Sequence, residues 1–217
     1  MIVAIDGPAG AGKSTVARRV ADRLDFQLID TGALYRIVAL RALEAGLEPE
    51  DGEAIAEVAR SLELDFVDEG LVCDGEPVGD EIRTPKVSQT TSEISSLPEV
   101  REALLGVQRR IGRRRDSVLE GRDIGTVVFP EAEVKIFLTA SAEERGRRRW
   151  EELVERGESA ELDEVVAEMK RRDKRDRSRD IAPLSQAPDA VVVDSTSLDP
   201  DEVVGRILEI VEDQRGG

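Results

Sequence analysis

A chain of 217 residues suits one α/β domain with an inserted sub-domain, so residues 1–217 are predicted to form a single domain. Its 31 basic and 47 acidic residues give a formal net charge of −16, which argues against binding to a nucleic-acid backbone, because such binding needs clustered cations. The only cysteine is Cys73, so an intramolecular disulfide is excluded. His and Asn are absent, which excludes imidazole chemistry and the Asn-Lys-x-Asp guanine reader of switch GTPases.

The amino-terminal residues and the apolar runs indicate where the protein works. The opening stretch, MIVAIDGPAG, lacks the basic start and the long apolar core of a signal peptide. No run approaches the ~20 apolar residues that span a bilayer. A single cysteine also fits a reducing compartment. We therefore expect a cytoplasmic protein without a membrane partner.

Apolar runs alternate with helical patterns along the chain. Ile2–Ile5 reads as a strand that meets a glycine-rich turn before the helical stretch Ser14–Leu24. A second strand and a second helix follow at Gln27–Asp30 and Ala33–Ala45. Strands alternating with helices predict a parallel sheet with helices on both faces. Three later runs have the length of buried strands: Val118–Glu120, Val134–Leu138 and Ala190–Val193.

Two segments depart from this alternation. Residues 62–97 contain short runs separated by Glu-Gly and Asp-Gly turns, which predict small antiparallel strands in an inserted sub-domain. Residues 141–180 are dense in charge of both signs, with about one apolar residue per turn, and predict a pair of exposed helices. The final helix, after Pro200, is expected to pack on the sheet. A basic cluster at Arg109–Arg115 is expected to offset the dipole at a helix C-terminus.

The turn after the first strand carries the pattern G-x-x-x-x-G-K-[ST], which cradles phosphates when it follows a strand and opens a helix. Its backbone N–H groups converge on a phosphate, Lys13 reaches the β- and γ-phosphates, and the Ser14 hydroxyl binds magnesium. The sequence therefore predicts a site for ATP and Mg²⁺. The ATP-binding residues are expected to be Gly7, Pro8, Ala9, Gly10, Ala11, Gly12, Lys13, Ser14 and Thr15.

A kinase for a phosphorylated acceptor must neutralise two anions, so arginines from several segments should converge. Arg36 lies just over a turn into the second helix and could bind an acceptor phosphate, or it is a solvated helix charge. Glu120 ends a predicted strand, in the position of an acidic residue of the magnesium shell. Arg122 and Asp123 follow it. Asp123 could accept from the exocyclic amine of cytosine; otherwise it caps a helix and Arg122 forms a salt bridge.

A third segment, residues 170–179, has seven cations and two anions in an acidic protein. On a helix, Arg172, Asp176 and Arg179 share one face, with Arg175 beside them. This face could clamp phosphates and hold a ribose hydroxyl, or it is a surface helix laced with salt bridges.

These stretches resemble the bacterial cytidylate kinases, which are P-loop nucleoside monophosphate kinases. The matching stretches lie between residues 2 and 184: IDGPAGAGKST, LIDTGALYR, EIRTPKVSQTTSEIS with PEVREALL, GRDIGTVVFPEAEVKIFL and RRDKRDRSRDIAPL. Two positions differ from the family's usual residues, since Glu120 stands where Asp is usual and Thr31 where Ser is common.

The resemblance implies roles for individual residues. Thr31, Tyr35 and Arg36 would lie along the monophosphate, and Arg122 and Arg179 would also bind its phosphate. Ser92, Arg101 and Asp123 would contact the cytosine edge, while Arg172 and Asp176 would hold the sugar. The catalytic set would be Lys13, Arg122, Arg175, Arg177 and Arg179, and the metal set Ser14 and Glu120. Segment 62–97 would be the monophosphate-binding insert, and 141–180 the helical lid.

The expected reaction is transfer of the γ-phosphoryl group of Mg-ATP to CMP, and to dCMP, by a monomer. Two alternatives remain open at this point. One is a P-loop kinase for another small acceptor, such as a different monophosphate or a sugar acid. The other is a nucleotide-dependent switch without kinase activity.

Overall fold

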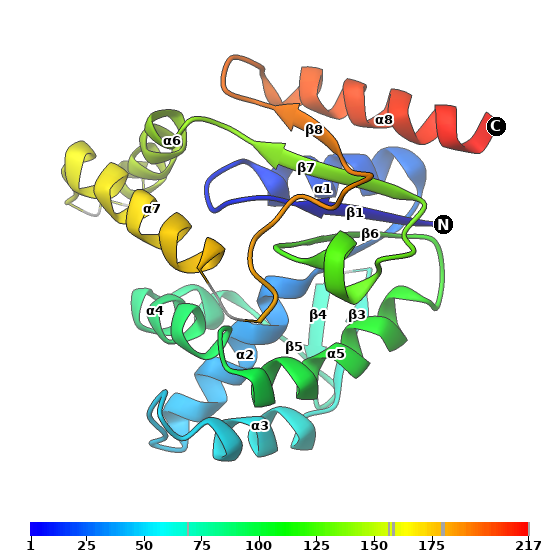
Figure 1. The fold of residues 1–217 in the computed structure, drawn as a ribbon. Helices are drawn as coiled ribbons and strands as arrows, with labels where there is room; N and C mark the ends of the chain where they lie inside the picture. The colour runs from blue at the N-terminus through cyan, green and yellow to red at the C-terminus, as the bar shows by residue number, and fades with distance from the viewer. Residues whose placement is uncertain (69, 156, 158, 179–180, 217) are drawn as a thin grey trace.

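The computed structural model describes residues 1–216 except 69, 156, 158 and 179–180. A five-stranded sheet in the order β2-β6-β1-β7-β8 forms its centre (Figure 1). All pairings in this sheet are parallel, which confirms the predicted sheet. Its strands are β1 (Ile2–Asp6), β2 (Gln27–Asp30), β6 (Ser117–Gly121), β7 (Val134–Thr139) and β8 (Val191–Asp194).

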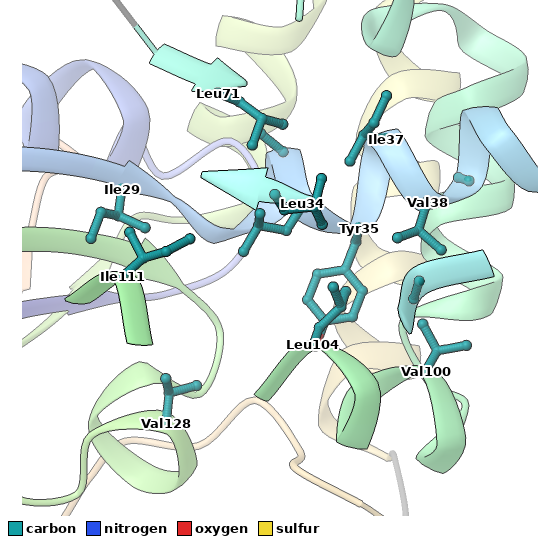
Figure 2. Packing of buried hydrophobic residues seen from close by; sticks show 14 of the residues in the cluster. Ile29, Leu34, Tyr35, Ile37, Val38, Leu71, Val100, Leu104, Ile111 and Val128 are labelled. Atoms are coloured by element: carbon teal, nitrogen blue, oxygen red, sulfur yellow. The ribbon is translucent and has the colours of Figure 1, made fainter. Parts of the chain in front are cut away.

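Helices cover both faces of this sheet and bury its inner strands on both sides. Val3 and Ile5 of β1 lie in a core cluster with α1 (Lys13–Leu24) and α8 (Pro200–Gly216). Ala4, between them, points the other way. It lies in a second cluster with α2 (Thr31–Glu44), α3 (Gly52–Ser61) and α5 (Pro98–Gly112). Figure 2 shows part of this second cluster, including Tyr35 of α2 and Leu104 of α5. The expected packing of the final helix on the sheet is confirmed.

The segment at 62–97 combines a small sheet with helical turns. Its antiparallel strands are β3 (Leu64–Val67), β4 (Gly70–Cys73) and β5 (Glu76–Pro77), as predicted. Its second half is helical instead: a 3₁₀ turn at Asp80–Arg83 leads into α4 (Pro85–Ile94). The Thr84 hydroxyl accepts from the backbone N–H of Val87, and Pro85 stands at the first position of the helix. This pair is a helix-start signal that the sequence prediction did not use.

Segment 141–180, the predicted lid, contains two helices, as expected: α6 (Ala142–Glu155) and α7 (Leu162–Arg177). They pack against each other. The Trp150 indole N–H donates to the carbonyl of Ala160 at 2.9 Å and joins α6 to the segment before α7. In the part of the chain that the structure describes, no helix is long and apolar enough to cross a membrane.

The basic cluster at the end of α5 joins that helix to neighbouring segments. The Arg109 side chain donates to the carbonyls of Val127 and Val128, each at 2.9 Å. Arg110 donates to the carbonyl of Leu64 at 2.7 Å, so it ties α5 to the small sheet. These arginines therefore satisfy carbonyls on other segments, a role beyond the expected neutralisation of a helix dipole.

Candidate active site

The phosphate loop connects β1 to α1 at the carboxyl edge of the sheet. Gly7 has a φ of +154° and packs so closely on β7 that a Cβ there would lie 1.9 Å from the carbonyl oxygen of Leu138. Gly12 has a φ of +87° and immediately precedes α1. Both positions therefore require glycine. The loop leads directly into the N-terminus of α1, where free backbone N–H groups can bind phosphate.

Ser14 and Glu120 meet beneath this loop. The Ser14 hydroxyl donates to Oε2 of Glu120 at 3.0 Å, while Oε1 of the same carboxylate is buried without a hydrogen-bond partner among the described residues. Burial, together with the negative charge of Asp30, raises the pKa of Glu120 to about 7. A cation would relieve this unsatisfied acceptor, so a hydroxyl and a carboxylate oxygen fit Mg²⁺. No group of three or more His, Cys, Asp or Glu side chains in the described chain could hold a metal alone.

Lys13 is buried near enough to Glu120 for the charge of that carboxylate to affect its pKa. Its ammonium donates to the carbonyl of Pro8 at 2.8 Å, and the residue is 6% exposed. Burial and the positive charge of Arg122 lower the pKa of Lys13 to about 7, against the opposing effect of Glu120. The lowered pKa shows that the surroundings disfavour the charged form of Lys13. An anionic phosphate bound beside it would raise this pKa and restore the protonated form.

Three arginines of the predicted site come from three different segments. Arg36 of α2 donates to Oγ of Ser88 at 2.8 Å, and burial together with Arg83, Arg149 and Arg122 lowers its pKa. Arg122, after β6, pairs through Nε with Asp176 of α7 at 3.2 Å. Burial and Arg122 lower the pKa of Arg172 to about 10. Arg122 lowers the pKa of Lys13, of Arg36 and of Arg172, so its guanidinium lies near all three.

Two of the residues expected to contact the cytosine ring form an ion pair with each other. Arg101 of α5 forms an ion pair with Asp123, and each side chain is 10% exposed. The Arg101 guanidinium also lies 5.8 Å from the centroid of the Tyr35 ring and donates to the carbonyl of Ser95 at 3.1 Å. Ser92 lies on α4, half-buried, where its carbonyl accepts from the Ser95 hydroxyl. Arg101 is a hydrogen-bond donor and Asp123 an acceptor, and an aminopyrimidine edge presents the complementary groups.

Comparisons with known proteins identify the family. The sequence model of cytidylate kinase matches residues 3–213. The chain belongs to the cytidylate kinase family. It is 52% identical to the cytidylate kinase of Citrifermentans bemidjiense over 98% of this chain and 91% of that protein. It is 50% identical to the cytidylate kinase of Geobacter sulfurreducens over 99% of this chain and 94% of that one. A solved structure of an uncharacterised protein from Eubacterium ventriosum shares the fold, with a TM-score of 0.55 at 14% identity over 98% of each chain.

Three of the site residues transferred from the cytidylate kinases have structural partners of their own. The Thr31 hydroxyl donates to the carbonyl of Glu120 at 2.7 Å, so it fixes the start of α2 to the end of β6. Tyr35 is 8% exposed and packs in the core below Arg101. Asp176 is 1% exposed and belongs to the buried stripe of α7.

The other site residues predicted on segment 141–180 lie in different places. Arg175 is close enough to Arg172 to lower its pKa. Arg177 lines a cavity of about 590 Å³ with Lys170, Lys174 and Arg145, between α7 and the end of β7. Because Arg177 is five residues from Arg172, the two point about 140° apart on the helix. Arg179 lies outside the described residues.

Asp6 is a residue beside the candidate site that the sequence prediction missed. It ends β1 and is 5% exposed. Its carboxylate accepts from the backbone N–H groups of Ile124 and Gly125, each at 2.8 Å. Burial raises the pKa of Asp6 to about 6, although these two hydrogen bonds oppose the rise. Asp6 therefore fixes the loop that carries Arg122 and Asp123 directly against the phosphate loop. No local pattern distinguishes Asp6 from any polar residue that ends a strand.

Proposed function

We propose that the protein transfers the γ-phosphoryl group of ATP to CMP, and to dCMP, giving the diphosphate and ADP. The observation that carries this proposal is the meeting of three segments: Ser14 of the phosphate loop donates to Glu120, Arg122 follows Glu120 and pairs with Asp176 of α7, and the buried Nε of Arg172 has no partner among the described residues. One cationic space beside the Ser14–Glu120 pair suits two phosphates brought end to end. The names of the relatives agree with this acceptor.

The reaction needs positioning and charge neutralisation. The acceptor phosphate is already an anion, so the site requires no general base. Lys13 would hold the β- and γ-oxygens, and Arg122 with Arg172 would stabilise charge on the group in transfer. Ser14 and Glu120 would hold Mg²⁺, directly or through water. When bound, it would offset the charge of the donor phosphates.

Cytosine would be chosen through Arg101 and Asp123. Asp123 would accept from the exocyclic amine, and Arg101 would donate to the ring nitrogen and carbonyl. Uracil presents a carbonyl where cytosine has the amine, so its oxygen would face a carboxylate oxygen of Asp123, acceptor against acceptor. The cost of losing this buried hydrogen bond is about 1 to 3 kcal/mol, which corresponds to roughly tens-fold discrimination.

Two segments would enclose the substrates. Arg36 donates to Ser88 Oγ and, at 3.4 Å, to the carbonyl of Ile82, so segment 62–97 lines the space proposed for the acceptor phosphate. The lid at 141–180 supplies Arg172 and Asp176 from the other side. Closure of both would exclude water and suppress ATP hydrolysis. We further propose that the protein acts as a monomer in the cytoplasm, without nucleic acid.

A coupled assay with CMP, dCMP, UMP, AMP and shikimate as acceptors tests the proposed function. We expect CMP and dCMP to give the highest kcat/KM, with UMP lower by roughly tens-fold. Preference for AMP or shikimate would show a kinase for another acceptor. ATP turnover that is equally fast without any acceptor would contradict both the transfer reaction and the closure of the lid.

A further inference from the structure

Arg145 is a buried arginine in the otherwise exposed charged surface of α6. It is 3% exposed, whereas Arg147, on the same helix, pairs with Glu144 and Glu151 at the surface. Burying a guanidinium is costly unless its N–H groups are satisfied. Neither Arg145 nor its main partner, Asp173, belongs to any of the substrate contacts proposed above.

The guanidinium of Arg145 joins three elements of the molecule. Its Nε donates to the carbonyl of Ala140 at the end of β7, at 2.9 Å. Nη1 donates to the carbonyl of Ala9, in the phosphate loop, at 3.0 Å. Both terminal nitrogens hold Asp173 of α7 in a forked ion pair, with Nη1 3.0 Å from Oδ1. Because the fork is planar, these bonds fix direction as well as distance.

The phosphate loop also packs closely against Arg145. Gly10 has a φ of +74°, and a Cβ there would lie 3.1 Å from the Cβ of Arg145. The tip of the loop, from Ala9 to Gly10, therefore rests on this residue through both a hydrogen bond and van der Waals contact. A movement of the loop on binding phosphate would be transmitted to Arg145.

Asp173 lies next to the part of α7 that faces the substrates. Arg172 precedes it, and Asp176, one turn later, pairs with Arg122. The Nε of Arg172 is buried without a partner among the described residues, as expected for a group that awaits an anion. Holding Asp173 therefore sets both the height and the rotation of Arg172 and Asp176 above the phosphate loop.

We infer that Arg145, through Asp173, positions the lid helix on the phosphate loop, so that α7 responds to the donor nucleotide. This inference rests on the proposed function for its kinetic consequence. Arg145 is a positioning residue, since its partners are backbone carbonyls and a carboxylate. Without it, ATP would still bind at Lys13 and Ser14, but Arg172 and Asp176 would not be held in place for transfer.

The deciding variant is the double substitution Arg145→Met/Asp173→Leu. Replacing both partners of a buried ion pair by apolar side chains of similar size is often neutral for stability, so this variant separates positioning from folding. The matched control is Arg147→Met, which removes an exposed arginine from the same helix. Thermal unfolding would show that each variant is folded.

Two readouts test the inference. The first is kinetic: kcat with CMP should fall by about 30- to 100-fold, because a displacement of about 1 Å costs that much, while the Kd for a non-hydrolysable ATP analogue changes less than about 3-fold. The second is hydrogen exchange in residues 162–177. The wild-type protein should gain protection there when the analogue binds, and the double variant should not. Arg147→Met should match the wild type in both.

The exchange readout needs no catalysis, so it can fail independently of the proposed function. If the wild-type protein lacked CMP kinase activity yet the analogue protected α7 only when Arg145 was present, the coupling would stand and the function would fall. A folded double variant with wild-type kcat and wild-type protection would overturn the inference. Should this variant not fold, Asp173→Asn keeps one acceptor for Arg145 and is judged by the same two readouts.

Discussion

The phosphate loop and the lid, which face each other across the site, are held by different forces. The strand and helix that flank the loop lie in an apolar cluster, with Val3, Ile5, Val16 and Ile207 fully or almost fully buried. In the described part of the lid helices, the buried apolar side chains are Val165 and Met169. The Arg122–Asp176 ion pair and the hydrogen bonds from Arg145 to the carbonyls of Ala9 and Ala140 join the lid to the rest. Figure 1 shows α6 and α7 together at one end of the sheet, away from the helices below it.

This difference indicates which half can move. Burial of apolar area is non-directional and stabilises the loop over a range of small displacements. A forked ion pair loses much of its energy when either partner shifts or rotates, and it is replaceable by water or by a substrate anion. The loop is therefore a fixed platform, and the lid is an element whose position depends on a few charge contacts.

Removing the positive charge of Lys13 from the phosphate loop should have the largest effect on kcat. Lys13→Met should lower kcat by about 10³-fold, because a preorganised cation at the transferred group is lost. Steady-state kinetics with ATP and CMP measure this. The matched control is Lys135→Met, which removes another buried lysine, one that pairs with Asp189 away from the site. A comparable loss of kcat in the control would mean that the effect comes from the fold.

The second-largest effect is expected from Asp176→Asn, which tests the ion pair between the lid and Arg122. The change removes the charge that pairs with Arg122 and should lower kcat/KM for CMP by about 10²-fold, since breaking a buried pair costs about 2 to 5 kcal/mol. Affinity for ATP should stay near wild type. Glu168→Gln, an exposed carboxylate on the same helix, is the control. Equal loss of affinity for ATP and CMP would contradict the division into two halves.

A smaller effect is expected at the base. Asp123→Asn should lower kcat/KM for CMP by roughly tens-fold and raise it for UMP, because an amide can donate to the uracil carbonyl. The ratio of the two kcat/KM values is the measurement. Asp189→Asn, which neutralises an exposed carboxylate, should leave this ratio unchanged. An unchanged ratio in Asp123→Asn would remove the carboxylate from base selection.

Local patterns in the sequence predicted the platform well and the lid's attachment poorly. The strands, the phosphate loop and the meeting of Ser14 with Glu120 follow from apolar runs and from the rule that ligands bind at the carboxyl ends of parallel strands. The Arg145–Asp173 pair does not, because the run Arg-Gly-Arg-Arg-Arg offers several equivalent cations. Which of them is buried depends on where α7 packs, 28 residues later in the chain. Long-range charge pairs leave no period in the sequence.

The last prediction concerns stability: replacing Glu120, a residue proposed to bind Mg²⁺, should stabilise the folded protein. Burial raises the pKa of Glu120 from 4.5 to about 7 in the folded protein. The folded state therefore holds this proton more tightly than the unfolded state. That contribution to stability is complete below pH 4.5 and is lost as the pH rises through about 7.

Glu120→Gln removes this penalty while it keeps an oxygen for the Ser14 hydroxyl. At pH 8 and without nucleotide, the variant should melt a few degrees higher than the wild type, since 1 kcal/mol corresponds to about 2 to 4 °C in a protein of this size. At pH 5 the two melting temperatures should converge. Calorimetry at both pH values measures this, with Glu133→Gln, an exposed carboxylate, as the control. A variant that melts lower than the wild type at pH 8 would show that the ionised carboxylate is already compensated by the fold, and the platform would then have no vacant charge for a cation to satisfy.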